Sequence, residues 1–177
     1  MKQIIYYVAV SLDGYIAGPN DDISQFILQG PGVDQYQSDL LSFNTVIMGR
    51  KTYEFGYQFG LPPGQPAYPN MEHHIFSNSL QLENKAPSVH IQAMDITVVK
   101  KLKQQASSDI YLCGGGAFAA WLLKHGQIDQ LKLKVNPIVL GGGTRLFQSV
   151  TNATAWNLED SIRYDDGMQI NSYTPGK

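Results

Sequence analysis

The chain has 177 residues, a formal net charge of −2 and one cysteine; 43% of its residues are hydrophobic and 16% are charged. These values are typical of a single folded domain, here spanning residues 1–177, and they exclude a disordered chain. The slight negative charge argues against nucleic acid as a partner, since no basic stripe is present to bind phosphates. No apolar run approaches the ~18 residues of a membrane span, and a lone cysteine suits a reducing compartment. We therefore expect a cytoplasmic protein that binds neither nucleic acid nor membrane.

The first third of the chain is predicted to alternate strands and loops around one helix. Residues 4–10 are continuously apolar and β-prone, as in a strand covered on both faces, and they lead into a loop over 11–20. Asp34 is predicted to cap a helix, and residues 45–48 to form a second buried strand. Thr52 is expected to cap or begin a short helix.

The middle of the chain adds two short predicted strands, over 73–76 and 88–91, and then a helix that Asp95 caps. The spacing of apolar residues predicts that this helix buries its valines and its leucine and exposes its lysines, Lys103 among them.

The last third begins with a predicted buried strand over 110–113, followed by three glycines and a helix over 117–125 that ends at Gly126. Residues 130–135 alternate strictly between apolar and polar, which predicts a strand with one face in water. A hairpin is expected around 165–167. The order of elements predicts a three-layer α/β/α domain with a mixed, mainly parallel sheet of about eight strands and a C-terminal antiparallel hairpin.

The stretch from the predicted strand at 110–113 through the three glycines into a helix is a natural seat for phosphate. Glycines let the backbone approach a ligand closely, and the first free N–H groups of a helix favour an anion. The alternative is a tight strand-to-helix connection without a ligand. Two further strand ends carry polar residues, Gly49 to Thr52 and Ser77 to Asn78. If the strands are parallel neighbours, all three loops open on one edge, which predicts a dinucleotide site.

A Rossmann fold is the competing dinucleotide site. Gly114, Gly116 and Ala119 match its relaxed fingerprint, G-x-G-x-x-A. That fold needs an acidic residue about twenty positions later, at the end of a second parallel strand. The region here, around 132–135, alternates as in an exposed strand, and too little chain follows to build the second half. We therefore reject it.

Four segments, in order, resemble the dihydrofolate reductase-like family, and in particular the C-terminal reductase domain of the bacterial riboflavin-biosynthesis enzyme. They are 11–17 (SLDGYIA), 46–54 (VIMGRKTYE), 114–116 and 137–147. Each is weak alone, but together they span nearly the whole chain in the family's order. The resemblance implies a reductase that uses NADPH to deliver a hydride to a pteridine-like or aminopyrimidine substrate.

The resemblance also implies which residues bind the cofactor. Ala9 and Ile16 would flank the nicotinamide, Arg50 would contact the 2′-phosphate, and a cis peptide bond is expected between Gly114 and Gly115. The implied cofactor-binding residues are Ala9, Ile16, Gly18, Gly49, Arg50, Lys51, Thr52, Ser77, Asn78, Gly114, Gly115, Gly116, Ala117 and Phe118. The chain departs from the family at Ala117, where dihydrofolate reductases often have a basic residue, which leaves the preference for NADPH over NADH open.

Two carboxylates are candidates for the catalytic residue. The family's substrate carboxylate lies early in the first helix, where the nearest match is Asp34, but a helix N-cap explains Asp34 equally well. Asp13 lies beside the implied nicotinamide loop, and turn formation with Gly14 is its alternative role. Neither has a near-neutral partner that would mark a proton donor, so a bound water is a third possibility.

The leading hypothesis is an NADPH-dependent oxidoreductase resembling 5-amino-6-(5-phosphoribosylamino)uracil reductase, with dihydrofolate reductase as the alternative enzyme. Two hypotheses of another class are a dinucleotide-binding homodimer without catalysis and a dimeric scaffold with a degenerate site. A homodimer is expected, through the loop at 56–70 and the strand at 131–135. No metal site is expected, because His73 and His74 point to opposite faces of a strand and the other histidines lack companions at ligand spacing.

Overall fold

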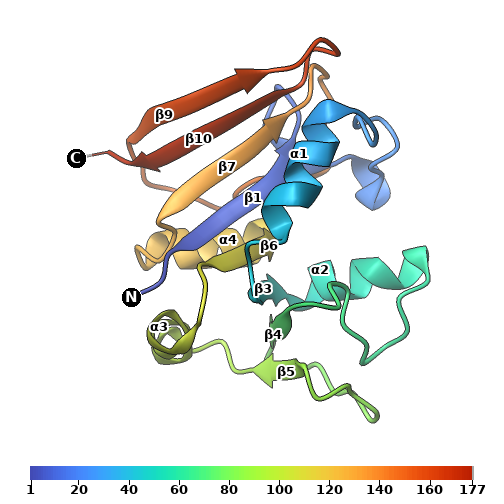
Figure 1. Cartoon of the computed structure of the whole chain (residues 1–177), viewed down its shortest axis with the longest axis vertical. Helices are drawn as coiled ribbons and strands as arrows, with labels where there is room; N and C mark the ends of the chain where they lie inside the picture. The colour runs from blue at the N-terminus through green and yellow to red at the C-terminus, as the bar shows by residue number, and fades with distance from the viewer. Residues whose placement is uncertain (177) are drawn as a thin grey trace.

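The centre of the molecule is an eight-stranded sheet in the order β5-β4-β3-β6-β1-β7-β10-β9, seen in a computed structural model that describes residues 1–176 (Figure 1). Its strands are β1 (Ile4–Val10), β3 (Thr45–Gly49), β4 (Glu72–Phe76), β5 (Val89–Gln92), β6 (Ile110–Gly114), β7 (Gln130–Val135), β9 (Trp156–Arg163) and β10 (Gln169–Pro175). All neighbours from β5 to β7 are parallel, whereas β10 is antiparallel to both β7 and β9. The mixed, mainly parallel sheet and the C-terminal hairpin are confirmed.

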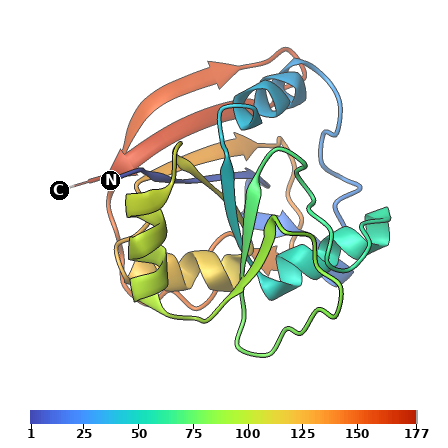
Figure 2. The same ribbon diagram turned by 60° about the horizontal axis from the view of Figure 1, so that its bottom comes forward.

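Helices cover both faces of this sheet (Figure 2). The helices are α1 (Pro31–Leu40), α2 (Arg50–Phe55), α3 (Ile96–Gln105) and α4 (Gly116–Lys124), with single 3₁₀ turns η1 (Pro19–Asp21) and η2 (Gly56–Phe59). Side chains of α3 and α4 pack in one core cluster and those of α1 and α2 in the other, which is the predicted three-layer arrangement. No helix among residues 1–176 combines the length and apolar character needed to cross a membrane.

The first helix begins earlier than predicted, and Asp34 does not cap it. Gly30, with a φ of 115°, is the N-cap, and Pro31 occupies the first turn, where proline's missing N–H costs nothing. The N–H of Asp34 donates to the carbonyl oxygen of Gly30 within that turn. Asp95 does cap α3 as predicted, because its Oδ1 accepts from the N–H of Thr97 at 2.8 Å.

Two predictions about lysines are wrong, and both errors have the same cause. Lys103 points inward from α3, is 7% exposed, and donates to Asp129 Oδ2 at 2.6 Å. The polar face of the strand at 130–135 is not in water, because α1 covers it: Lys134 is only 9% exposed and lies over the Tyr36 ring, and Lys132 pairs with Asp39. A periodic pattern shows which residues share a face, but it cannot show whether that face is covered.

Candidate cofactor site

The three polar loops predicted to converge do lie together, at the carboxyl ends of their strands. They follow β3, β4 and β6, which are parallel neighbours, and the loop after β1 opens on the same edge. The loops also touch one another. The hydroxyl of Thr52 lies against Gly115, and the guanidinium of Arg50 donates from Nη1 to Ser79 Oγ at 3.0 Å. This edge therefore has the geometry of a ligand site at the carboxyl ends of parallel strands.

The glycine triplet is required by its neighbours in the protein. A Cβ on Gly116 would overlap the carbonyl oxygen of Arg145, and one on Gly115 would lie 2.9 Å from Thr52 Oγ1. Gly114 has a φ of 134°, a conformation that side chains rarely adopt, and its bond to Gly115 is cis, as the resemblance implied. These contacts explain three consecutive glycines without a ligand. Support for a dinucleotide therefore comes from the loops around the triplet.

The start of α4 presents backbone donors at this edge. Gly115 is its N-cap, so the next N–H groups have no acceptor within the helix. Ala117 is exposed, whereas the Phe118 side chain is 5% exposed and stacks on Phe76 at 4.9 Å between ring centroids. Phe118 can therefore contribute only its backbone to a phosphate. Gly126, with a φ of 62°, ends this segment as predicted.

Arg50 is the exposed cation of the site. Its Nε donates to Glu54 Oε1 at 2.8 Å and its Nη1 to Ser79, and its side chain is 44% exposed. Since a guanidinium has five N–H donors in a planar fork, several remain free for a phosphate. Ser79 was not predicted to belong to the site. The sequence could have indicated Ser79, because it lies two residues after Ser77 on the same loop.

Ser77 and Asn78 shape the loop after β4. Ser77 Oγ accepts from the N–H groups of Ser79 and Leu80, at 3.1 and 2.9 Å. Asn78 Oδ1 accepts from the N–H of Met94 at 3.0 Å, which ties this loop to the segment before α3. The Ser77 hydroxyl hydrogen and the Asn78 amide N–H groups are left to contact a ligand.

The loop after β1 is held by a network centred on Asp13. Its Oδ1 accepts from Ser11 Oγ at 2.6 Å and from the N–H of Leu140 at 3.0 Å, and its Oδ2 accepts from the N–H of Gly141 at 2.7 Å. The hydrogen bond from Ser11 is the main cause that lowers the pKa of Asp13 to about 2. These bonds favour the turn-forming role, because such a carboxylate has no proton to give near neutral pH.

The remaining predicted residues lie around that loop and at the junction of β3 with α2. Ala9 is on β1, Ile16 is on the short strand β2 (Tyr15–Ala17), and Gly18 donates its N–H to the carbonyl oxygen of Asp22 at 2.7 Å. Strand β2 pairs with β8 (Thr144–Arg145), so the second glycine run, residues 141–143, is joined to the loop after β1. Lys51 is exposed at the start of α2 and Gly49 packs against Phe118, where a Cβ would lie 3.2 Å from the phenylalanine Cβ.

Asp34, the other predicted catalytic residue, lies in the first turn of α1 with an exposed side chain. No side-chain hydrogen bond or ion pair of Asp34 occurs among residues 1–176. The acid that α1 does anchor is Asp39, which accepts from Tyr7 and Lys132 through Oδ2 and from Gln35 through Oδ1. The catalytic roles of Asp34 and Asp13 stay predictions.

A cluster that sequence reasoning missed lies beneath α1, on the same face of the sheet as Ala9. Lys134 Nζ lies 3.6 Å from the centroid of the Tyr36 ring. The Tyr36 and Tyr111 hydroxyls are 2.7 Å apart, and Cys113 Sγ is 3.5 Å from a further tyrosine hydroxyl, that of Tyr68. Burial raises the pKa of Tyr36 to about 12 and also raises the pKa of the Cys113 thiol. Burial lowers the pKa of Lys134 to about 8, so its ammonium is the group of this cluster that titrates nearest neutral pH.

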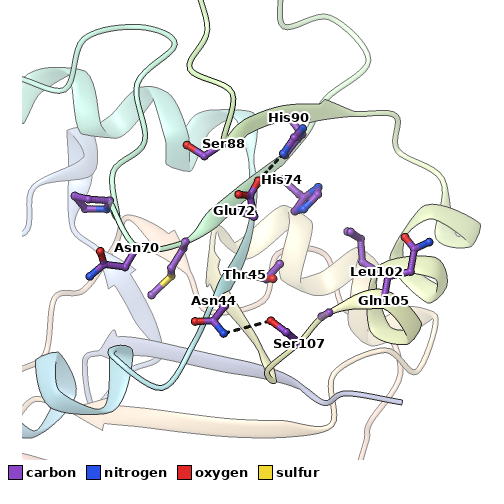
Figure 3. Close-up of a pocket in the computed structure, with 13 residues that line it drawn as sticks. Asn44, Thr45, Asn70, Glu72, His74, Ser88, His90, Leu102, Gln105 and Ser107 are labelled. Atoms are coloured by element: carbon purple, nitrogen blue, oxygen red, sulfur yellow. Dashed lines mark hydrogen bonds and ion pairs between the residues drawn. The ribbon is translucent and has the colours of Figure 1, made fainter.

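A surface cavity of about 570 Å³ lies at the other end of the strands (Figure 3). Thr45 and Glu72 begin β3 and β4 there, and His74 and His90 stack with ring centroids 4.9 Å apart. Burial lowers the pKa of His74 to about 4, and the exposed His90 contacts Glu72 at 2.7 Å. The amino ends of the strands line this cavity, whereas the loops described above follow the carboxyl ends. The cavity therefore lies away from those loops. We assign it no part in the cofactor site.

Comparison with known proteins identifies relatives in sequence and in fold. The chain is 31% identical over 172 residues to YwjB of Bacillus subtilis, covering 96% of both chains. Its fold matches dihydrofolate reductase from Enterococcus faecalis, solved with NADP(H), with a TM-score of 0.69 and 14% identity over 99% of this chain and 97% of that one. It also matches the deaminase/5-amino-6-(5-phosphoribosylamino)uracil reductase of Thermotoga maritima, with a TM-score of 0.67 and 15% identity over 99% of this chain and 57% of that one. The RibD C-terminal domain family matches residues 2–170, and the chain therefore belongs to that reductase family.

Proposed function

We propose that this chain is an NADPH-dependent reductase of a pyrimidine- or pteridine-type heterocycle, with 5-amino-6-(5-phosphoribosylamino)uracil as the leading substrate. The observation that carries the proposal is the convergence of three polar strand-end loops beside Ala9, in a member of the RibD C-terminal domain family. The cytoplasmic location and the homodimer stay predictions. A second copy would not add a strand along β7, since both edges of that strand are occupied.

The residues of this edge suit a dinucleotide phosphate. Arg50 would hold the 2′-phosphate with its free guanidinium donors, and the N–H groups at the start of α4 would hold the pyrophosphate. Ala9 and Ile16 would flank the nicotinamide. Bound NADPH supplies the hydride, while the protein supplies orientation and electrostatics.

Dihydrofolate is the less favoured substrate. A glutamylated folate would call for a largely apolar pocket, whereas the face beneath α1 carries Lys132, Lys134 and several tyrosine hydroxyls. Such a lining suits a small polar heterocycle that carries carbonyl and amino groups.

The test is a titration of the protein with NADPH and, separately, with NADH, followed by quenching of Trp emission. Trp121 is a suitable reporter, because its ring stacks on Phe118 with centroids 5.8 Å apart, two residues beyond the glycine triplet. We expect Arg50→Ala to weaken NADPH binding about 10- to 100-fold, the value of one charge-assisted hydrogen bond, and to leave NADH binding unchanged. Arg163→Ala, on β9, is the matched control and should change neither affinity.

Turnover separates an enzyme from a binding module. NADPH oxidation should occur with 5-amino-6-(5-phosphoribosylamino)uracil and be slower or absent with dihydrofolate. Cofactor binding without turnover of either compound would favour the non-catalytic module. Failure to bind both NADPH and NADH would contradict the proposal and favour a scaffold with a degenerate site.

A further inference from the structure

Strand β7 brings an amine to the place where the nicotinamide is expected. In the parallel pairing of β1 with β7, Lys134 is the partner of Ala9. Paired residues of neighbouring strands project from the same face of a sheet, so the two side chains are adjacent. The Lys134 side chain runs beneath α1, where its Nζ lies over the Tyr36 ring at 3.6 Å from the centroid.

This amine differs from the two other lysines that the fold draws inward. Lys103 pairs with Asp129 and Lys132 pairs with Asp39. Among residues 1–176, Lys134 Nζ has no hydrogen bond and no carboxylate within ion-pair distance, although the residue is only 9% exposed. Its only charge-stabilising contact in this part of the chain is the Tyr36 ring, and a largely buried lysine without an anionic partner marks a functional position better than a structural one.

The surroundings leave Lys134 as the group that titrates near neutral pH. Burial lowers its pKa to about 8. Burial opposes ionisation of Asp39, but hydrogen bonds from Lys132 and Gln35 outweigh it and hold its pKa below the usual range. The tyrosines gathered on this face from α1, β1, β6, the loop before β4 and the turn after β9 all have raised pKa values, mainly through burial; they are Tyr7, Tyr36, Tyr68, Tyr111 and Tyr164. Burial also raises the pKa of the Cys113 thiol.

We propose that Lys134 is the proton donor of the reaction, with its ammonium group bound to the nitrogen or oxygen of the C=N or C=O bond that is reduced; in a ribosylaminopyrimidine this bond is the imine that forms at the sugar carbon when the sugar ring opens. This inference rests on the proposed reductase function. The substrate carbon accepts the hydride of the reduced nicotinamide, which becomes oxidised, while the adjacent nitrogen or oxygen takes a proton from Lys134. The neutral amine then regains a proton from water. Neither Asp13 nor Asp34 is needed as a proton donor.

The first test needs no substrate. Lysine labelled with ¹³C at Cε is titrated by NMR in the free protein, with NADPH and with NADP⁺, and Lys134→Arg assigns the signal. If Lys134 lies beside the nicotinamide, the positive ring of NADP⁺ should lower its apparent pKa relative to NADPH by about one pH unit, the usual effect of a close like charge. Lys132, two residues away on the same strand, is the internal control and should not respond.

The second test uses kinetics with 5-amino-6-(5-phosphoribosylamino)uracil as the probe. Lys134→Met should slow hydride transfer about 100-fold or more, as the loss of a general acid does, with NADPH affinity unchanged. Because the ammonium form is the active one, the wild-type rate should fall as pH rises through about 8. Lys134→Arg keeps the charge and should lose this fall, whereas Lys100→Met, on the exposed face of α3, should keep it.

Different results would contradict the proposed reductase function and the proposed role of Lys134. If NADPH does not bind, the proposed function is wrong. If NADPH binds and the Lys134 signal titrates identically with NADPH, with NADP⁺ and in the free protein, the reductase proposal stands and the role of Lys134 is wrong. Turnover by Lys134→Met with an unchanged pH profile would also overturn the role of Lys134.

Discussion

Gly116 lies against the backbone at the end of β8, where the next loop begins, and the absence of a side chain there is a packing requirement. The carbonyl oxygen that a Cβ would strike belongs to Arg145, and that loop is bonded in turn to the triplet, since the N–H of Gln148 donates to the Gly116 carbonyl oxygen at 3.1 Å. The first loop joins the same assembly, because the N–H of Leu146 donates to the Gly14 carbonyl oxygen at 2.9 Å. Single glycines thus hold the site's loops together.

We expect Gly116→Ala to lower the free energy of unfolding by about 2–3 kcal/mol, because a backbone atom cannot move aside as a flexible side chain can. The matched control is Gly142→Ala, in the second glycine run, where the nearest atom to a new Cβ is Pro19 Cγ at 4.0 Å. That substitution should be neutral or slightly stabilising. Urea unfolding followed by Trp fluorescence measures both; equal stability of the two variants would contradict the packing argument.

At the scale of elements, Asp129 joins α3 to the start of the sheet. Its Oδ2 accepts from Lys103 at 2.6 Å and from the N–H of Ile4 at 2.7 Å, at the first residue of β1. The amphipathic pattern of α3 assigned all its lysines to the solvent face, but the last turn of the helix approaches this acid. A charge that has an ionic partner can be buried where an isolated one would be excluded.

Removing the acid should therefore cost more than removing the lysine. Asp129→Ala leaves the 7%-exposed Lys103 without a partner and should destabilise the protein by about 2–3 kcal/mol, with allowance for the partial exposure of Asp129. Methionine is similar in length to lysine and carries no charge. Lys103→Met should therefore lower the free energy of unfolding by less than about 1 kcal/mol. Chemical denaturation measures the free energy of unfolding of both variants. A larger decrease for Lys103→Met than for Asp129→Ala would show that the ion pair itself is strongly stabilising.

At the scale of the whole molecule, the parallel half of the sheet determines where ligands can bind. Strands β5, β4, β3, β6, β1 and β7 are parallel neighbours, so the loops that follow them all lie at the carboxyl ends of the strands. The antiparallel pair β10 and β9 extends the sheet past β7 and converts β7 into an inner strand. The open edges of the eight-stranded sheet are thus β5 and β9. On β9, Glu159, Asp160 and Arg163 make further strand addition unfavourable.

A ligand that joins loops from several strands should stabilise the whole fold. At 100 times its dissociation constant, NADPH should add about 2.7 kcal/mol to the free energy of unfolding. For a chain of this length, that raises the melting temperature by about 5–10 °C. The shift should shrink for Arg50→Ala and persist for Arg163→Ala in differential scanning fluorimetry. Equal shifts with NADPH and NADH would mean that Arg50 does not recognise the 2′-phosphate.

The sequence by itself determined the order and type of most elements and the loops that converge at the site. Apolar runs such as 46–48 and 110–113 predict buried strands, Asp95 and Gly126 mark the ends of helices, and parallel strands bring their polar loops to one edge. These signals are local, or follow from topology alone, so they can be found without coordinates.

Only the tertiary structure decided which faces are covered and which polar groups meet. The alternation at 130–135 is the same whether its lysines face water or a helix, and the structure places Lys134 beneath Tyr36 because β10 and α1 enclose β7. The pairing of Lys103 with Asp129, and the hold of Asp13 on the loop at 140–141, join residues far apart in the chain. Burial is a property of the packed molecule, so the group that we infer to donate the proton was hidden in a pattern typical of a solvent-exposed strand.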